Sequence, residues 1–167
     1  IYNIPYWLSP PKIIQKDMPP INKYYDFTIQ FSDQLEHKED FYELSYRTGA
    51  TRIDSWIDIE GGFGNLFANA SLRKLFPNQP YDVEGDPIDL SRGGRFMAHH
   101  ILVPKRGVAV HINAFNFPIW GMLEKCAVNW MAGVPAVVLP APQTAYLTEA
   151  VVRVIVDSGI LPEGSLQ

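Results

Sequence analysis

A regular alternation of apolar runs and helix-period segments over residues 107–158 constrains the fold of this chain more than any other feature. Residues 107–113 and 135–139 are nearly continuous apolar runs, whereas residues 119–132 and 144–158 repeat apolar side chains at the spacing of a helix. Strands and helices that alternate over short links are typical of a parallel sheet, whose crossovers need a dozen or more residues. The sequence therefore predicts an α/β fold with a right-handed crossover between the two strands.

Proline and glycine mark the ends of the predicted helices. Pro118 suits the first position of a helix, because its missing N–H would have no helical partner there. Gly133 and Gly159 stand where the two helices should end, and Pro162 follows the second stop. Since both strands are apolar along their length, we expect both faces of the sheet to be covered. Ligands of α/β folds bind where a strand end meets a helix start, which here is residues 112–118.

The chain before this unit predicts irregular and helical structure. The prolines of residues 1–20 disfavour a long helix or a central strand, so we expect an irregular segment lying against a larger body. Residues 22–46 predict one or two helices, and residues 51–76 predict another. Residues 77–94 are rich in proline and glycine and predict a surface connection. Residues 96–103 then predict a hairpin strand that turns into the first core strand.

Three small motifs in this part of the chain allow either a functional or a purely structural interpretation. Residues 61–64 are glycine-rich, but they do not follow a strand, so close helix packing is favoured over a phosphate loop. Asp54 and Asp58 lie one turn apart with no histidine nearby, which predicts a polar helix face. His99 and His100 point to opposite faces of a strand, so we predict a packed strand and no metal site.

Composition and charge exclude several classes of protein. The chain has 14 Lys and Arg against 18 Asp and Glu, a net charge of −4, which is unlike the basic surface of a nucleic-acid binder. It has no apolar stretch of membrane-spanning length and no signal-peptide pattern. A single cysteine, Cys126, rules out an internal disulfide and suits the cytoplasm. The chain begins at Ile1 and ends where a further strand should begin, so we expect a piece of a longer protein.

The predicted ligand junction contains the triplet Asn116-Phe117-Pro118, which follows a strand and precedes residues 133–141. In this context it resembles the aldehyde dehydrogenase superfamily. Longer segments resemble one branch of it, the PaaZ-like bifunctional phenylacetate-degradation proteins, and these segments are residues 48–52, 54–62, 111–118 and 120–125. The resemblance covers about residues 41–167 and implies an aldehyde dehydrogenase-like fold, in which N-terminal helices and a hairpin precede the first βαβα of a Rossmann-like parallel sheet.

The same resemblance implies three parts of the chain. Residues 1–94 would be an N-terminal irregular and helical region. Residues 95–106 would be an oligomerisation-type hairpin strand, whose edge can pair with a neighbouring subunit. Residues 107–167 would be the first half of a dinucleotide-binding domain.

Members of this family attack an aldehyde with a cysteine thiolate, and a hydride then passes to a nicotinamide cofactor. The resemblance implies that Asn116 donates a hydrogen bond to the resulting oxyanion, a role that suits an amide fixed between a strand end and a helix start; helix capping is the alternative. It implies that Lys125 belongs to a proton relay, with an ordinary helix lysine as the alternative. It also implies that Phe117, Gly121 and Glu124 line the substrate tunnel.

Cys126 is not expected to be the nucleophile. It falls inside a predicted helix and suits the core. The family's catalytic cysteine, its catalytic glutamate and its glycine-rich turn follow far downstream and are absent from these residues. We therefore expect the chain alone to have no dehydrogenase activity, and we expect no metal site.

The resemblance assigns cofactor binding to the two strand ends, at Ile112, Asn113, Ala114, Phe115, Leu139, Pro140, Ala141 and Pro142. Leu139 stands where the family usually has a lysine that holds the adenosine ribose or its 2′-phosphate, so we expect weak binding. Pro142 stands where members that prefer NAD often have a glutamate for the ribose hydroxyls. The loss of that carboxylate is compatible with NADP, with NAD as the alternative.

The branch implies NADP-linked oxidation of a CoA-bound semialdehyde, of the 3-oxo-5,6-dehydrosuberyl-CoA semialdehyde type, in phenylacetate or aromatic degradation. The alternatives are a non-catalytic relative retained for assembly and a fragment of an acyl-CoA reductase. The expected partners are a small-molecule aldehyde, for which the branch implies a CoA-linked form, and further copies of the chain in a homo-oligomer. Neither nucleic acid nor a membrane is expected as a partner.

Overall fold

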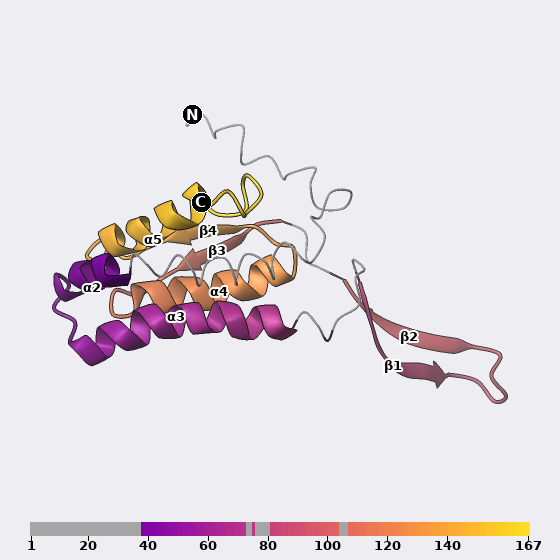
Figure 1. Cartoon of the computed structure of the whole chain (residues 1–167). Coiled ribbons are helices and arrows are strands. Elements are labelled where there is room, and N and C mark those ends of the chain that lie inside the picture. Colours follow the sequence, from indigo (N-terminus) through magenta and orange to yellow (C-terminus); the bar gives the residue numbers. More distant parts are fainter. Residues whose placement is uncertain (1–37, 73–74, 76–80, 104–106) are drawn as a thin grey trace.

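The computed structural model describes residues 38–72, 75, 81–103 and 107–167, which form a helical and sheet-containing body and a projecting hairpin (Figure 1). The predicted irregular segment at residues 1–20, and most of the helical segment predicted from residue 22, lie outside the described residues. None of the described helices is both long and apolar enough to cross a lipid bilayer.

The predicted βαβα unit is present in the body. Its elements are β3 (Ala109–Ile112), α4 (Pro118–Met131), β4 (Ala136–Leu139) and α5 (Ala145–Asp157). The two strands are parallel, with Ala109 opposite Ala136 and Ile112 opposite Leu139. Gly133 and Gly159 follow the two helices with φ of 72° and 63°, a conformation that glycine adopts without steric cost. The α/β fold class predicted from the sequence is therefore confirmed.

A third strand begins to pair with β4 at the end of the chain. The amides of Ala136 and Gln167 donate to the carbonyls of Ser165 and Ala136, each at 3.0 Å. Leu166 forms a parallel bridge with Ala136. The last residues thus pair with β4 where a further strand was expected, although they form an isolated bridge rather than a strand.

The prediction that both faces of the sheet are covered is wrong for the described residues. On β3, Val110 is 67% and Ile112 is 75% exposed, and Leu139 on β4 is 58% exposed. Helix α4 packs against both strands and α5 packs beside α4, so the described helices cover only one face. An apolar strand sequence indicates that a strand can be buried on both sides, but it does not show which segment supplies the second cover.

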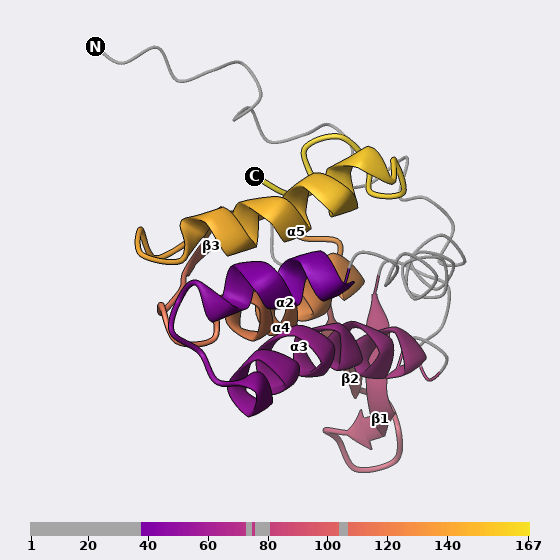
Figure 2. The same ribbon diagram turned by 60° about the vertical axis from the view of Figure 1, so that its left-hand side comes forward.

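Two further helices complete the body. Helix α2 (Lys38–Tyr46) and helix α3 (Arg52–Leu72) agree with the helices predicted in these regions. Helix α3 packs along α4, and α2 lies against both α3 and α5 (Figures 1 and 2). The buried apolar side chains of the four helices and β4 form one cluster: Phe41, Tyr42, Ile59, Phe63, Leu66, Ile119, Met122, Leu123, Cys126, Ala127, Trp130, Ala136, Leu147, Val151 and Ile155.

The glycines of α3 permit close packing against α4, as favoured from the sequence. A Cβ added to Gly62 would lie 3.1 Å from the backbone N and Cα of Trp120. A Cβ added to Gly61 would lie 2.2 Å from Cζ3 of the Trp120 side chain. Because the contact at Gly62 is with backbone, a side chain there would push the two helices apart, whereas at Gly61 it would displace the Trp120 ring.

The hairpin is formed by β1 (Asp82–Asp89) and β2 (Met97–Leu102), which pair antiparallel. The strand predicted at residues 96–103 is confirmed, but its partner is β1 rather than the first core strand. The prediction of a surface connection over residues 77–94 is wrong for β1, which contains Gly85 and Pro87. The register shifts between Glu84 and Ile88, so the two strand-breaking residues fall in an irregularity of the ladder, where proline is tolerated.

Candidate active site

The predicted ligand-binding segment, residues 112–118, lies at the carboxyl edge of the two core strands. The amide of Asn113 donates to the carbonyl of Leu139 at 3.0 Å, which extends the pairing beyond β3. This pairing brings the two sets of predicted cofactor residues, 112–115 and 139–142, to the same edge of the sheet. Residues 113–117 then connect β3 to the first residue of α4, Pro118.

Asn116 lies in this connection with its side chain exposed. The alternative that it caps α4 is wrong, because the N-cap residue of α4 is Phe117 and no side chain at that position caps the helix. Within the part of the chain that the structure describes, the Asn116 side chain has no hydrogen-bond partner. Its amide therefore remains available to a ligand.

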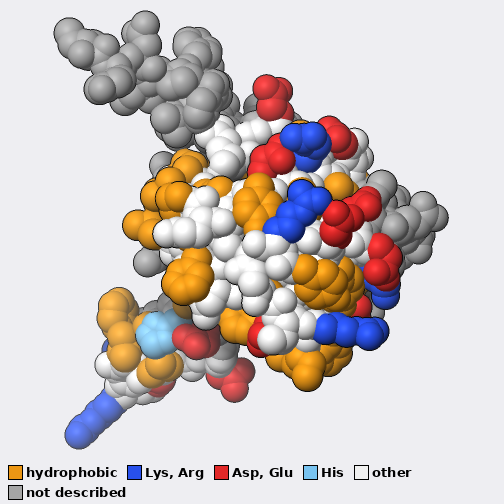
Figure 3. Space-filling view, turned by 90° about the vertical axis from the view of Figure 1, so that its left-hand side faces the viewer, with side chains coloured by type: hydrophobic (Ala, Val, Ile, Leu, Met, Phe, Trp, Pro, Cys, Tyr) orange, Lys and Arg blue, Asp and Glu red, His pale blue; other side chains and the backbone are white. Residues whose placement is uncertain are grey.

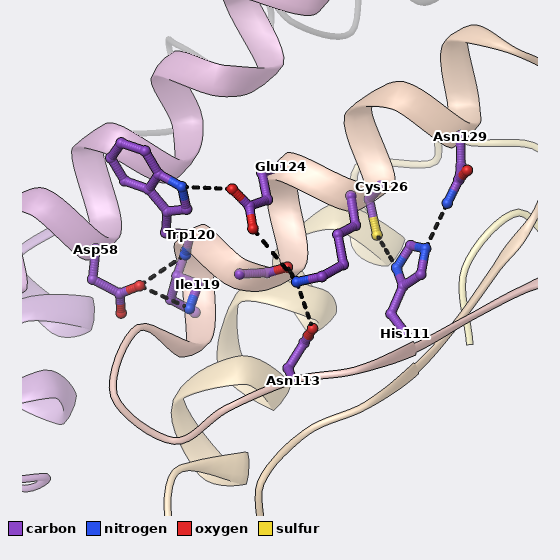
Figure 4. Close-up of polar contacts among 10 residues, drawn as sticks. Asp58, His111, Asn113, Ile119, Trp120, Glu124, Cys126 and Asn129 are labelled. Atoms are coloured by element: carbon purple, nitrogen blue, oxygen red, sulfur yellow. Dashed lines mark hydrogen bonds and ion pairs between the residues drawn. The ribbon is translucent and has the colours of Figure 1, made fainter.

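The amides at the start of α4 are held instead by Asp58, from the first half of α3 (Figure 4). Its Oδ1 accepts hydrogen bonds from the backbone N–H of Ile119 at 3.0 Å and of Trp120 at 2.8 Å. Asp58 is only 3% exposed, so the prediction that it belongs to a polar helix face is wrong. Burial raises the pKa of Asp58 to about 6, while the two amide donors act in the opposite direction.

Asp58 is the functional candidate that the sequence reading missed. A usable signal was present, because Ser55, Asp58 and Gly62 recur at spacings of three and four residues and all are buried on one face of α3. The side chains on that face are too small and too polar for an ordinary apolar stripe. It instead indicates a surface on which another helix lies close.

Lys125 links α4 to the strand end. Its Nζ donates to Oδ1 of Asn113 at 3.2 Å and to the carbonyl of Gly121 at 2.5 Å, and lies 3.5 Å from Oε1 of Glu124 (Figure 4). Oε2 of Glu124 in turn accepts from the indole N–H of Trp120 at 2.9 Å. The Lys125 ammonium group therefore contacts three other residues predicted for the site, Asn113 just after β3 and Gly121 and Glu124 in α4.

The remaining predicted residues contribute differently. Phe117 is half-buried, and Nδ2 of Asn113 is buried without a hydrogen-bond partner among the described residues. Phe115 is exposed, as are Ile112 and Leu139. The edge thus combines apolar side chains with a buried unpaired amide donor on Asn113 and the exposed amide of Asn116.

Cys126 is fully buried behind this edge, which confirms its predicted place in the core. Its Sγ lies 3.8 Å from Nδ1 of His111, and Nε2 of the same ring lies 2.5 Å from Nδ2 of Asn129. Burial raises the pKa of the Cys126 thiol to about 12. Burial and the charge of Lys125 lower the pKa of His111. Both groups are therefore uncharged near neutral pH, and Cys126 is not an activated nucleophile.

No metal centre accompanies the site in the described ranges. No group of three or more His, Cys, Asp and Glu residues there could hold a metal ion. His99 and His100 are exposed on β2 rather than packed, and Nδ1 of His100 lies 3.7 Å from Oε2 of Glu84.

The end of the molecule at the left of Figure 1 has a mixed surface, on which hydrophobic side chains lie among acidic and basic ones (Figure 3). A separate open pocket of about 390 Å³ lies between α2 and α3. It is lined by Lys38, Glu39, Tyr42, Tyr46, Arg52, Ile53, Trp56 and Glu60. None of these residues was predicted for the site.

The described residues form an α/β fold in which the predicted site residues lie at the carboxyl edge of a parallel strand pair. The model of the aldehyde dehydrogenase family matches residues 28–167. The chain therefore belongs to the aldehyde dehydrogenase family.

Among the proteins that resemble the chain are one relative by sequence and one solved structure. One is 3,4-dehydroadipyl-CoA semialdehyde dehydrogenase of Aromatoleum evansii, which is 38% identical over 130 residues, 77% of this chain and 25% of that protein. The other is the crystal structure of an NADP-dependent glyceraldehyde-3-phosphate dehydrogenase from Bacillus halodurans C-125 complexed with NADP. That structure has a TM-score of 0.66 at 21% identity and matches 90% of this chain and 31% of its own. The chain thus spans about a quarter to a third of the proteins that it resembles.

Proposed function

We propose that this chain supplies part of the coenzyme-binding half of an NADP-dependent aldehyde dehydrogenase that oxidises a CoA-linked semialdehyde in aromatic degradation. In this proposal residues 107–167 are the first half of the dinucleotide-binding domain. The observation that carries it is Asn116, which is exposed beside the strand edge and does not cap α4. The relative that acts on a CoA semialdehyde supports the substrate class.

Asn116 would act on the oxygen of the aldehyde. When a cysteine thiolate from elsewhere in the complete enzyme attacks the carbonyl carbon, negative charge develops on that oxygen. The amide of Asn116 donates a hydrogen bond to it, and the donor needs no large reorganisation because its loop is fixed between β3 and α4. The contact is stronger with the oxyanion than with the neutral carbonyl, so it lowers the barrier rather than only tightening binding.

Lys125 would keep a positive charge close to the same loop. Its ammonium group is held by Asn113 and by the carbonyl of Gly121, and Glu124 lies at the limit of hydrogen-bond distance. This arrangement can hold or pass a proton at Nζ, with Glu124 as the adjacent acceptor. Phe117 and Gly121, which are half-buried beside it, would line the approach of the substrate.

The side chains at the strand ends suit the flat rings of a nicotinamide dinucleotide better than the 2′-phosphate of NADP. Ile112, Phe115 and Leu139 expose apolar side chains at this edge, on which flat rings can pack. Residues 139–142 contain no basic side chain for a 2′-phosphate, and the next basic residue, Arg153, is paired with Glu149. When bound, the cofactor supplies the hydride acceptor; residues 112–115 and 139–142 would hold it.

Assembly into a homo-oligomer in the cytoplasm accompanies this proposal. The hairpin supports the assembly, because its strands leave their outer edges unpaired among the described residues and expose apolar side chains such as Val83 and Ile101. Light scattering of the full-length protein measures the number of copies. A monomer would remove this part of the proposal without affecting the chemistry.

The role of Asn116 is tested by Asn116→Ala in the full-length enzyme. We expect kcat to fall by about 10²–10³ with little change in KM, because the lost hydrogen bond forms mainly in the transition state. Steady-state kinetics with a CoA-linked semialdehyde, together with the urea midpoint, separates this effect from unfolding. An unchanged kcat would contradict the proposal and favour a non-catalytic relative retained for assembly.

The cofactor is tested by Leu139→Lys in the full-length enzyme. A charge-assisted hydrogen bond to the 2′-phosphate is worth about 1.5–3 kcal/mol, so NADP should bind roughly 10- to 100-fold more tightly to the variant. Calorimetric titration with NADP measures this gain, and NAD, which lacks the 2′-phosphate, is the control. Tight NADP binding by the parent without a gain in the variant would show that other residues hold the phosphate.

A further inference from the structure

Asp58 contacts the loop of the proposed site from a distant part of the chain. It lies in α3, 61 residues before Ile119 and 62 residues before Trp120, and both of these amides donate to its Oδ1 (Figure 4). The carboxylate is nine-tenths or more buried, and both contacts are to backbone groups. A change at Asp58 therefore acts on the path of the α4 backbone.

The contact lies at the first turn of α4. Pro118 is the first residue of this helix and has no N–H to donate, so Ile119 and Trp120 carry the first amides that can. A carboxylate suits this place, because the unpaired amides and the helix dipole give the N-terminus a partial positive charge. With Asp58 absent, two amides at the buried start of the helix would lose their partner.

A second contact holds the same turn in place. Gly62 follows Asp58 by one turn of α3, and its missing side chain lets α3 approach the backbone of Trp120. Polar and steric contacts from one face of α3 thus fix the direction in which α4 begins. Asn116 precedes Pro118 by two residues, and the restricted φ of proline transmits this direction to the loop.

We propose that Asp58 is a positioning residue for Asn116: by holding the first turn of α4 from α3, it keeps the Asn116 amide directed at the reacting oxygen. This inference rests on the proposed function, in which Asn116 stabilises the oxyanion. A shift of about 1 Å in a catalytic group can cost about 10²-fold in rate, so a contact that only fixes the loop has a measurable effect.

The test is a double-mutant cycle in the full-length enzyme with Asp58→Ala, Asn116→Ala and the pair. We expect Asp58→Ala to lower kcat roughly 10- to 100-fold with KM nearly unchanged. In the Asn116→Ala background the same change should lower kcat by no more than about threefold, because the group that it positions is already gone. Asp58→Asn, which keeps an acceptor oxygen, should restore most of the activity.

Two controls separate positioning from general destabilisation. Ile59→Ala removes a neighbouring core side chain without touching the α4 amides. At temperatures below its unfolding midpoint, this variant should keep a kcat within about threefold of the parent value. If Asp58→Ala does not fold, Asp58→Glu, whose longer side chain displaces the carboxylate, takes its place in the cycle. An equal loss of kcat in both Asn116 backgrounds, or an equal loss in Ile59→Ala, would overturn the role of Asp58. An unchanged kcat in Asn116→Ala alone would instead refute the proposed function.

Discussion

The helical body and the hairpin use similar apolar side chains in opposite ways. In the body, apolar residues of α3, α4 and α5 meet in one cluster in which many side chains are fully buried. In the hairpin, almost every residue of β1 and β2 is exposed, including Val83, Ile88, Ile101 and Leu102. The two strands pair with each other, and their main packing contact among the described elements is with one another. The hydrophobic effect should therefore stabilise the body strongly and the hairpin weakly within this chain.

The strongest test of this comparison removes the same side chain from each region. Leu123 in α4 is 0% exposed, whereas Leu102 in β2 is 52% exposed. We expect Leu123→Ala to lower the free energy of unfolding by about 2–5 kcal/mol, because it leaves a cavity in the core. We expect Leu102→Ala to change it by about 0.5 kcal/mol or less. Urea unfolding of the 167-residue chain measures both.

An equal loss in the two leucine variants would break the comparison. It would show that the hairpin is buried against another surface in solution, as pairing between copies would require. The dependence of the Leu102→Ala midpoint on protein concentration would then distinguish contact between copies from contact within one chain.

The body was largely predictable because its local signals agree with one another. Pro118, Gly133 and Gly159 stand at helix ends, and the apolar runs between them have strand length. Each signal depends on a few neighbouring residues, so no knowledge of distant contacts was needed. Residues 112–115 and 139–142 were assigned to the cofactor by the family resemblance, and the parallel pairing of β3 and β4 brings them to one edge of the sheet.

The wrong predictions concern contacts between residues far apart in the sequence, which local sequence patterns do not reveal. Asp58 reads as a surface carboxylate on α3 until α4 is placed against it, because its partners lie about 60 residues away. Gly85 and Pro87 read as breakers until the shifted register of the hairpin accommodates them. Val110 and Ile112 are exposed on β3 although the apolar pattern predicts cover, because a pattern along one strand does not contain the segment that would pack on it.

A second test sharpens the comparison within the body. In Gly62→Ala, the new methyl group would meet the Trp120 backbone at about the 3.1 Å found for an added Cβ, so α3 and α4 must separate. We expect a net loss of about 1–2 kcal/mol, since overpacking outweighs the gain in helix propensity. The control is Gly64→Ala, where no atom lies within 4 Å and stability should rise by about 0.5–1 kcal/mol. Equal thermal midpoints for the two variants would show that the helix contact is looser than the structure has it.

The smallest effect is expected at the tip of the hairpin. Asp89 accepts hydrogen bonds from the amide of Ser91 at 2.9 Å and from the amide of Gly94 at 2.8 Å, next to a bond from Leu90 N–H to the carbonyl of Phe96. The hydrogen bond from the Ser91 amide contributes most to lowering the pKa of Asp89. The stabilisation that the ionised Asp89 gives to the loop is therefore complete above the pKa that this carboxyl has in the unfolded chain. It is lost as the pH falls through the pKa of Asp89 in the folded chain.

We expect Asp89→Ala to loosen this loop without weakening the body. The amide hydrogens of Leu90 and Gly94 should exchange faster in the variant, because the bonds that order the tip are removed. The urea midpoint of the variant should match that of the parent, since the tip shares no buried side chain with the core cluster. Asp86→Ala, an exposed change elsewhere in β1, is the matched control and should leave both amides unaffected. A fall in body stability as large as that of Gly62→Ala would mean that the hairpin and the body unfold as one unit, and the contrast between the two regions would then be one of exposure alone.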